Sequence, residues 1–497
     1  MRSIRIAALL VFALAPLALA QSASPASQAA ATITPHDVQA RIEFLASDEL
    51  RGRDTPSPGL ETAARYIADQ FATLELKPAG DSGTFIQRWP FSNKKMDLAT
   101  LKAELHSKTQ HTLTLGQDFF VVPAPSVDSL VGAVVYAGVS GTTSQANPAL
   151  AGRIAAFYAP GGEMSSAWES GVKAGVMAAF SSQARGVIFI LDPEFDADDV
   201  AHVAANLGGA TAPLPILAVR NDVARAWLTD GDLDLGAGAS TPAEPKAIAG
   251  ASVRLLTGMT GSTSRPPNVV AILEGSDPAL KDTYVVFSAH MDHVGVGRPN
   301  QQGDSIYNGA DDDASGTSAI MELAEAFAAM QPRPKRSLIF LTVSGEEKGL
   351  YGSKYFVENP PVPVEKMVAN INLDMIGRNA PDTTVAIGQD YSSLGETVQA
   401  VVKAHPELEI LVAQDLWPEE RLFFRSDHYN FAMKKVPALF FTSGLHADYH
   451  KPSDEPATID NDKLARTAQL VFWLGHEIAN SATAPTWTEA GLKAIAR

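Results

Sequence analysis

The chain has 497 residues, no cysteine and a formal net charge of −17 at pH 7. An acidic surface of this size disfavours nucleic acid and anionic membranes as partners, and the lack of cysteine excludes disulfides, thiolate nucleophiles and cysteine metal ligands. A chain of this length exceeds a single hydrophobic core, so two or three domains are expected.

Residues 1–20 have the pattern of a secretory signal peptide. Arg2 and Arg5 precede an apolar run that closes with the small residues Ala18-Leu19-Ala20, and this run is too short to span a membrane. A buried first helix is the alternative interpretation. Cleavage after Ala20 would remove two arginines and change the formal charge from −17 to −19. The sequence therefore predicts a periplasmic or extracellular protein with no membrane partner.

Residues 33–124 are predicted to form the N-terminal part of a catalytic domain. The stretch Thr34–Asp37, with proline in second place, is typical of a helix start. Apolar residues then recur at helical spacing between Leu60 and Phe71. This part of the chain therefore contributes helices to the domain.

Residues 125–245 differ from the preceding segment in their sequence pattern and are predicted to be an inserted domain. The runs "VGAVVYAGV", "RIAAFY", "GVIFIL" and "LPILAV" are short and rich in β-formers, with Gly, Ala and Pro between them. The segment holds one lone histidine, His202, and no cluster of acids. We expect an accessory domain without chemistry of its own.

Residues 246–482 show a regular alternation of strand and helix patterns. The apolar run "TYVVFSAHMDHVG" leads to His290, and "SLIFLTVSGEE" leads to Glu346 and Glu347. Such continuous runs are typical of strands buried on both faces. In an open α/β sheet, ligands bind beyond the carboxyl ends of the strands. The same edge should therefore collect all three side chains.

Two further runs and one loop bring more candidate ligands to that edge. "MVANINLDMIG" leads to Asp374, and "VPALFFTSGLHADYH" runs on to His450. Between the first two strands, "NGADDDASG" places Asp311, Asp312 and Asp313 at the mouth of a predicted helix. Each residue alone has an ordinary structural reading, such as a cap or a solvated turn. Their concurrence on separate segments predicts a metal site.

The motifs resemble, in order, the signature segments of the zinc aminopeptidase S/aminopeptidase Y family of co-catalytic metallopeptidases. The segments that carry the likeness are "SAHMDHVG", "NGADDDASG", "SGEEKGLYGS", "NLDMIG", "RSDHYNF" and "GLHADYHKPSD". The likeness extends to the leading "FLASDELRGRDT", and residues 125–245 resemble a protease-associated (PA) domain. It implies an α/β fold with a mixed, mostly parallel sheet sandwiched by helices, the β-rich PA insertion and a C-terminal tail at 483–497.

The resemblance also implies two Zn²⁺ ions per chain. His290 and Asp374 would bind one ion, Glu347 and His450 would bind the other, and Asp312 would bridge the two. The peptide bond between Asp312 and its successor would be cis. The outer two aspartates of the triplet would form hydrogen bonds around the turn.

The remaining site residues follow from the same resemblance. Asp292 would orient the histidine ligand two residues before it, and Glu346 would act as the general base. Tyr449 would stabilise the oxyanion. The backbone at Arg425 would help to hold the α-amine of the substrate. Asp454 would orient the ring of the last histidine ligand.

The sequence leaves several alternatives open. Relatives on this fold include carboxypeptidases and dipeptidases with the same metals, glutaminyl cyclases with one zinc, and receptor-like modules that have lost ligands. The contiguous triplet Ser426-Asp427-His428 cannot adopt the geometry of a serine triad. His36, His111 and His405 are not part of this concurrence of candidate ligands and are expected to be structural. The expected partners are peptides with a free N-terminus, and no oligomeric state is predicted.

Overall fold

The computed structural model describes residues 24–92, 95–107, 110–115, 117–122, 129–142, 146–159, 166–191, 214–227 and 239–496. The predicted signal peptide and His202 lie outside these residues. The chain forms two compact units. The first unit comprises the segments up to Pro90 and from Arg265 onward, and the second unit comprises Phe91–Ser264.

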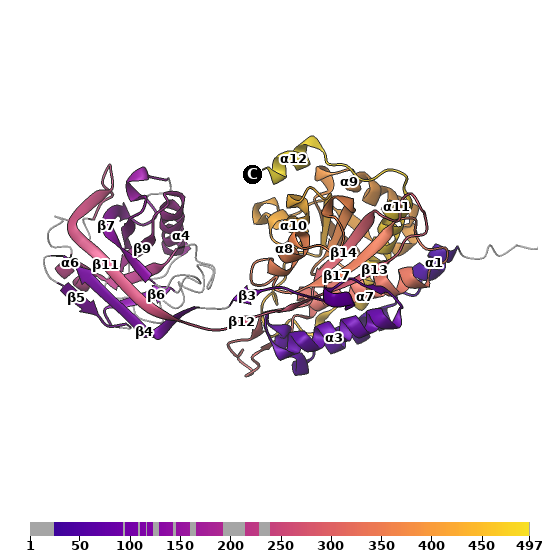
Figure 1. Cartoon of the computed structure of the whole chain (residues 1–497), viewed down its shortest axis with the longest axis horizontal. Coiled ribbons are helices and arrows are strands. Elements are labelled where there is room, and N and C mark those ends of the chain that lie inside the picture. Colours follow the sequence, from indigo (N-terminus) through magenta and orange to yellow (C-terminus); the bar gives the residue numbers. More distant parts are fainter. Residues whose placement is uncertain are drawn as a thin grey trace, which may run out of the picture. The chain divides into compact units, whose positions relative to one another are not determined.

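A nine-stranded sheet forms the centre of the first unit (Figure 1). Its order is β1-β13-β17-β14-β18-β21-β19-β20, with β2 also paired to β13. The four central strands β17, β14, β18 and β21 run parallel, and antiparallel pairs flank them. The strands are β1 (Lys77–Pro78), β2 (Ile86–Arg88), β13 (Pro267–Leu273), β14 (Tyr284–His290), β17 (Ser337–Val343), β18 (Met367–Leu373), β19 (Thr383–Ile387), β20 (Leu411–Ala413) and β21 (Ala438–Thr442).

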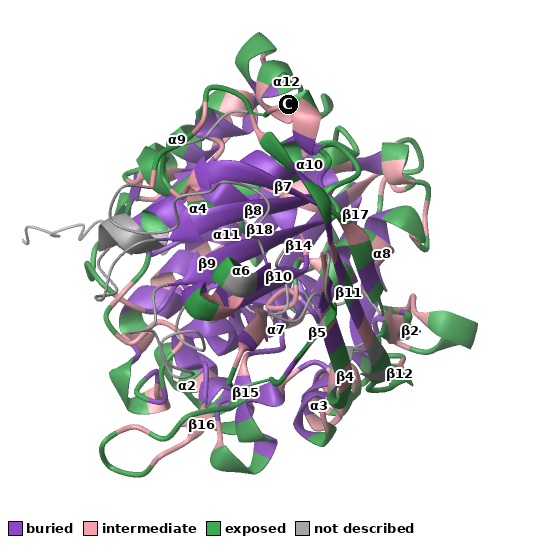
Figure 2. Ribbon diagram, turned by 90° about the vertical axis from the view of Figure 1, so that its left-hand side faces the viewer, coloured by how far each residue is buried: buried purple, intermediate pink, exposed green. Residues whose placement is uncertain are grey.

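The strand predictions from the apolar runs are confirmed for this sheet. Every residue of β17 is buried, as are all residues of β14 after Tyr284. Figure 2 colours the chain by burial and shows mostly buried strands together with exposed loops. Because consecutive residues of a strand point to opposite faces, both faces of the sheet need a cover. The mixed α/β sandwich is therefore the observed fold class.

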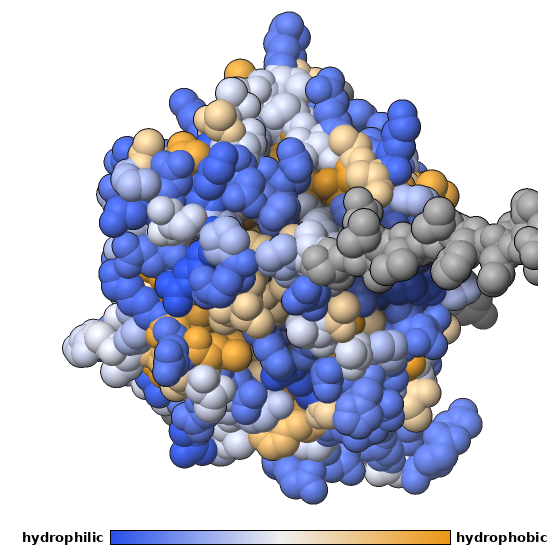
Figure 3. Space-filling view, turned by 90° about the vertical axis from the view of Figure 1, so that its right-hand side faces the viewer, coloured by the Kyte–Doolittle hydropathy of each residue, from blue (hydrophilic) through white to orange (hydrophobic). Residues whose placement is uncertain are grey.

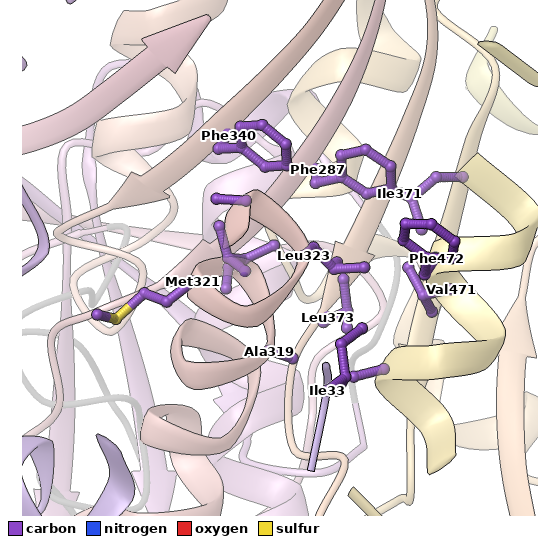
Figure 4. Packing of buried hydrophobic residues seen from close by; sticks show 14 of the residues in the cluster. Ile33, Phe287, Ala319, Met321, Leu323, Phe340, Ile371, Leu373, Val471 and Phe472 are labelled. Atoms are coloured by element: carbon purple, nitrogen blue, oxygen red, sulfur yellow. The ribbon is translucent and has the colours of Figure 1, made fainter. Parts of the chain in front are cut away.

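Helices cover both faces of this sheet. Phe287 and Phe340 on the strands pack against Leu323 of α7 and Phe472 of α11 (Figure 4), while Val286 and its neighbours pack on α8 and α10 on the other face. The helices are α1 (Pro25–Ala30), α2 (Pro35–Leu45), α3 (Pro58–Thr73), α7 (Gly316–Ala329), α8 (Tyr351–Glu358), α9 (Leu394–Ala404), α10 (His428–Met433), α11 (Asn461–Asn480) and α12 (Glu489–Ile495).

The helix starts follow the predicted local signals. Thr34 caps α2 by accepting a hydrogen bond from the backbone N–H of Asp37 at 3.2 Å, and Pro35 occupies the first turn. Ser57 caps α3 in the same way. These caps fix the chain direction as it approaches the sheet.

The second unit has its own eight-stranded sheet, in the order β5-β4-β11-β7-β8-β9-β10-β6. Strands β7 to β10 are parallel neighbours, and the outer pairs are antiparallel. Its elements are β3 (Phe91–Ser92), β4 (Lys95–His106), β5 (Gln110–Leu113), β6 (Phe119–Val122), β7 (Ser129–Val139), β8 (Ile154–Ala159), α4 (Ser166–Ser181), β9 (Gly186–Leu191), β10 (Ile216–Arg220), α6 (Asn221–Trp227), β11 (Lys246–Thr260) and β12 (Thr263–Ser264).

This unit is wider than the predicted insertion at 125–245. Strand β11 pairs with β4, so that Ser252 lies opposite His106, and β6 closes the far edge beside β10. Strands predicted to belong to the catalytic domain, within 33–124 and 246–482, are therefore part of the second sheet. The reason is that long-range pairing, rather than local pattern, decides which sheet a strand joins.

The surface of the described residues is mainly polar where Figure 3 shows it. Hydrophilic residues cover most of this face, and apolar residues occur between them in small groups. Among the described residues, no helix combines the length and the apolar character that crossing a membrane requires.

Candidate metal centre

The predicted ligands converge where the central strands end. His290 closes β14, Glu347 follows β17, Asp374 follows β18, and His450 lies on the segment after β21. The Nε2 atom of His290 lies 3.1 Å from Asp312 Oδ1 and 3.5 Å from Asp374 Oδ1. The Nε2 atom of His450 lies 3.2 Å from Asp312 Oδ2 and 3.1 Å from Glu347 Oε2. The Asp312 carboxylate therefore stands between the two imidazoles.

The polar atoms of this cluster fit a bound cation. His450 Nε2 and Glu347 Oε1 are buried, and neither has a hydrogen-bond partner of acceptable geometry among the described residues. Buried polar atoms are normally hydrogen-bonded, so a converging set without partners is a set of open ligand positions. Nitrogen and carboxylate oxygen are the donors that zinc accepts when cysteine is absent.

A second group of possible ligand atoms comprises His290, Asp313 and Asp374. The Asp313 carboxylate, however, already accepts backbone N–H groups from His290 at 3.1 Å, Gly316 at 2.9 Å and Met375 at 3.2 Å. Its lone pairs are used to fold the turn. Asp312, which faces both His290 and His450, is therefore a better candidate than Asp313 for a ligand beside His290.

The other aspartates of the turn also hold the backbone. Asp311 Oδ1 accepts the N–H of Gly377 at 2.6 Å, which joins the turn to the segment after β18. The predicted hydrogen bonding of the outer aspartates is thereby confirmed, and the bond between Asp312 and Asp313 is cis. Gly309 precedes the turn with φ of +59°, and an added Cβ would lie 2.3 Å from the carbonyl oxygen of Asp312.

Asp454 differs from the prediction. Its carboxylate accepts the backbone N–H groups of Asp311 at 3.1 Å and Asp312 at 3.2 Å. The prediction that it orients the His450 ring is therefore replaced by a role in the turn. The reason is that unpaired amides at the start of the irregular turn need acceptors, and Asp454 is the carboxylate placed to supply them.

Asp292 lies beneath the site and is fully buried. Its carboxylate accepts hydrogen bonds from the Thr55 hydroxyl at 2.8 Å and from the Gly345 N–H at 2.7 Å. The Nδ1 atom of His290 is 3.7 Å from this carboxylate and 3.1 Å from the Asp292 carbonyl oxygen. The same residue therefore contacts the imidazole and fixes the loop that carries Glu346.

The two adjacent glutamates have opposite electrostatic environments. Burial raises the pKa of Glu346, and the Glu347 and Asp374 carboxylates raise it further. Burial also opposes ionisation of Glu347, but the imidazoles of His293 and His450 outweigh it and lower the pKa of Glu347 to about 2. Environments that separate neighbouring carboxyl groups in this way are typical of sites in which the two perform different tasks.

A pocket opens against this cluster. Tyr449 and Arg425 both line it, and the Tyr449 ring stacks on His450 with centroids 3.9 Å apart. Burial raises the pKa of the Tyr449 hydroxyl, which therefore keeps its proton. The Arg425 guanidinium donates to Glu420 Oε2 at 3.1 Å. The other lining residues are His290, Asp312, Glu346, Asp374, Met375, Leu422, Phe440, Thr442, Gly444 and Leu445.

Three residues around the site had no predicted role. His293 places Nδ1 2.8 Å from Glu347 Oε1, Arg53 donates to four backbone carbonyls of the loops behind the site, and Ser426 donates to Asp374 Oδ2 at 2.6 Å. All three stand within the motifs quoted above, so the motifs themselves are the available signal.

Part of the chain, within its C-terminal half, matches a known protein family. Residues 268–474 match the model of peptidase family M28. A "probable zinc metalloprotease" of Pyricularia oryzae is 38% identical over 141 residues, which are 26% of this chain and 26% of that protein. One from Pyrenophora teres f. teres is 37% identical over 111 residues, 22% of this chain and 23% of that protein. The matches thus span about a quarter of these relatives.

Solved structures share the fold over nearly the whole chain. An aminopeptidase from Aneurinibacillus sp. strain AM-1 is 19% identical, with a TM-score of 0.55 and coverage of 93% of this chain and 97% of that one. A zinc aminopeptidase from Bacillus subtilis is 18% identical, with a TM-score of 0.52 and coverage of 91% and 97%. These likenesses show the mixed α/β fold of the chain.

Proposed function

From the premise that residues 268–474 form a peptidase family M28 segment, we propose that the protein is a di-zinc aminopeptidase. It removes N-terminal amino acids from peptides. The observation that carries the proposal is the convergence of His290, Asp312, Glu347, Asp374 and His450 beside a pocket that also receives Glu346. The zinc metalloprotease and aminopeptidases to which the chain is similar support the choice of zinc and of aminopeptidase activity.

The ligand set divides around the shared carboxylate. His290 and Asp374 would hold one ion, Glu347 and His450 the other, and Asp312 both, since its two oxygens face different imidazoles. When bound, two zinc ions supply Lewis-acid polarisation of the scissile carbonyl and lower the pKa of the attacking water.

Two side chains of the pocket have the properties that peptide hydrolysis requires. Glu346 takes a proton from the attacking water and returns it to the leaving amine. It lines the pocket, and its pKa is raised whereas that of Glu347 is lowered, so the two carboxyl groups suit different roles. The protonated Tyr449 hydroxyl donates to the oxygen that becomes negative in the transition state. Asp292 holds the Glu346 loop through the Gly345 N–H.

The charges of the pocket favour an amine over a carboxylate. Glu346 and Asp374 face it, and a free α-amine, with a reference pKa of about 7.7–8.0, carries positive charge near neutral pH. A C-terminal carboxylate would call for a free guanidinium. The Arg425 guanidinium is engaged with Glu420, and Arg425 is the one arginine among the described lining residues.

The apolar part of the pocket accommodates the side chain of the residue to be removed. Four apolar side chains line it together with the ligands, which disfavours a charged first residue. We expect a preference for leucine or methionine at the N-terminus of the substrate. The apolar residues are Met375, Leu422, Phe440 and Leu445.

The signal-like residues 1–20 support export, so the proposed substrates are peptides outside the cytoplasm. The test is an activity screen of the zinc-loaded protein on leucyl chromogenic substrates, each beside its N-acetylated form. Acetylation should lower kcat/KM at least about tenfold, which corresponds to about 1.4 kcal/mol of transition-state stabilisation. Equal cleavage of blocked and free substrates would assign the protein to the carboxypeptidases or endopeptidases instead.

A further inference from the structure

His293 stands at the second half of the metal centre without an assigned role. Its ring is fully buried three residues beyond the end of β14. The Nδ1 atom lies 2.8 Å from Glu347 Oε1 and 3.7 Å from Asp312 Oδ2. Its ring centroid is 5.5 Å from that of His450. One ligand atom from each of these four residues lies within 4.8 Å of all the others.

The Nδ1 atom of His293 lies at hydrogen-bond distance from Glu347 Oε1, 2.8 Å, but the contact lacks the geometry of a hydrogen bond. Both of its ring nitrogens are buried without a hydrogen-bond partner of acceptable geometry among the described residues, and the same holds for Glu347 Oε1 and His450 Nε2. A buried imidazole that served only to orient Glu347 would direct an N–H at that carboxylate. The observed arrangement is instead the one expected when several donors surround a common centre.

The backbone behind His293 holds the ring in this place. A Cβ atom added to Gly309 would lie 2.5 Å from Cγ of His293, so the ring occupies the space that a larger residue would take. The N–H of His293 is bonded to the Arg53 carbonyl oxygen at 3.4 Å. The lack of a side chain at Gly309 therefore leaves room for the imidazole beside Asp312 and Glu347.

We propose that His293 is a direct ligand of the second metal ion, through Nδ1, together with Asp312, Glu347 and His450. This inference rests on the proposed two-ion site. It makes that site a closed set of two nitrogens and two oxygens, the number that tetrahedral zinc requires. The set at His290, Asp312 and Asp374 has three protein ligands and keeps a position open. The two ions should consequently differ in affinity, with the ion at His293 held more tightly.

The decisive measurement is zinc K-edge X-ray absorption of the wild-type protein with zinc alone bound, beside its zinc content by mass spectrometry. We expect two zinc ions with three imidazole ligands in total. The His293→Ala variant should have two imidazole ligands in total. Its affinity for the tighter ion should fall by more than about 100-fold, beyond the 10–100-fold typical of residues that only orient a ligand. The number of imidazole ligands is measured on the wild-type protein. The test therefore remains decisive even if the His293→Ala variant folds poorly.

A matched control is His446→Ala. His446 is also buried and its Nε2 lies 3.3 Å from Asp311 Oδ2, but it is outside the four-residue group, so the imidazole count should not change. Two zinc ions with only two imidazoles in the wild type would overturn the role of His293 and leave the proposed function intact. A protein that binds fewer than two zinc ions would overturn the two-ion proposal itself.

Discussion

Replacing Arg53 with methionine tests whether a buried guanidinium holds the loops of the metal centre together. Arg53 is fully buried and donates to the carbonyl oxygens of Met291 at 2.8 Å, Asn308 at 2.7 Å and Gly309 at 2.9 Å, and also to that of Leu45. Burial lowers its pKa to about 10, so the group is still charged at neutral pH. One side chain thus connects the N-terminal segment to two of the loops beside candidate ligands, those at Met291 and at Asn308.

The expected loss follows from these contacts. Hydrogen bonds from a charged donor contribute about 1.5–3 kcal/mol each, but four on one group do not add. Methionine fills much of the volume and leaves the four carbonyl acceptors without this donor. We therefore expect Arg53→Met to lower the free energy of unfolding of the first unit by about 3–5 kcal/mol. Arg53→Lys should restore only part of it, because one ammonium group cannot reach all four acceptors.

The assay is urea-dependent hydrogen exchange of peptides from β14, which reports on the first unit alone. The control is Arg88→Met, because the Arg88 side chain is 37% exposed and pairs with Glu61 at the surface. Surface ion pairs contribute about 0–1 kcal/mol. If Arg53→Met and Arg88→Met destabilise β14 equally, the guanidinium does not hold the loops and the reasoning is wrong.

Three further outcomes are expected. Glu346→Gln should keep its zinc by mass spectrometry and lose about 100-fold to 10,000-fold in kcat; wild-type turnover with metal bound would exclude Glu346 as the base. Gly309→Ala should destabilise the first unit by about 2 kcal/mol or more, since its φ is +59° and the new Cβ would meet the His293 ring. Gly303→Ala, with φ of +88° and open space around it, is the control that carries backbone strain alone. A chain in which a short linker replaces residues 91–264 should fold and bind zinc, because the N–H of Trp89 already bonds to the Pro266 carbonyl oxygen; failure to bind zinc would show that the second unit contributes to the site.

Local patterns in the sequence predicted the first unit well. Continuous apolar runs identified β14, β17, β18 and β21, because a strand buried on both faces leaves no room for polar residues. The convergence of the side chains that follow these strands came from the rule that parallel strands end at one edge. Neither inference needs knowledge of distant pairing.

The missed features depend on distant pairing or on side-chain direction. Strand β4 joins the second sheet because it pairs with β11, which lies well over a hundred residues later in the chain. The hydrophobic periodicity within residues 33–124 does not indicate which strand β4 pairs with. His293 is one residue beyond Asp292, outside the strand, where spacing no longer says where a ring points. The Arg53 guanidinium donates hydrogen bonds to backbone carbonyl oxygens of remote loops. Every residue has such an acceptor, so the sequence does not indicate which ones Arg53 contacts.

The structure also shows what the additional carboxylates of the candidate metal centre do. Asp292, Asp311, Asp313 and Asp454 each accept backbone N–H groups, so their charges are matched by amide dipoles and they shape the loops. Asp312 instead faces two imidazoles through opposite oxygens. An unpaired carboxylate is costly to bury, and each backbone N–H that a carboxylate accepts uses a lone pair that a cation would otherwise engage. The run of three aspartates therefore combines two tasks: the outer residues fold the turn, and the middle residue keeps its carboxylate facing His290 and His450.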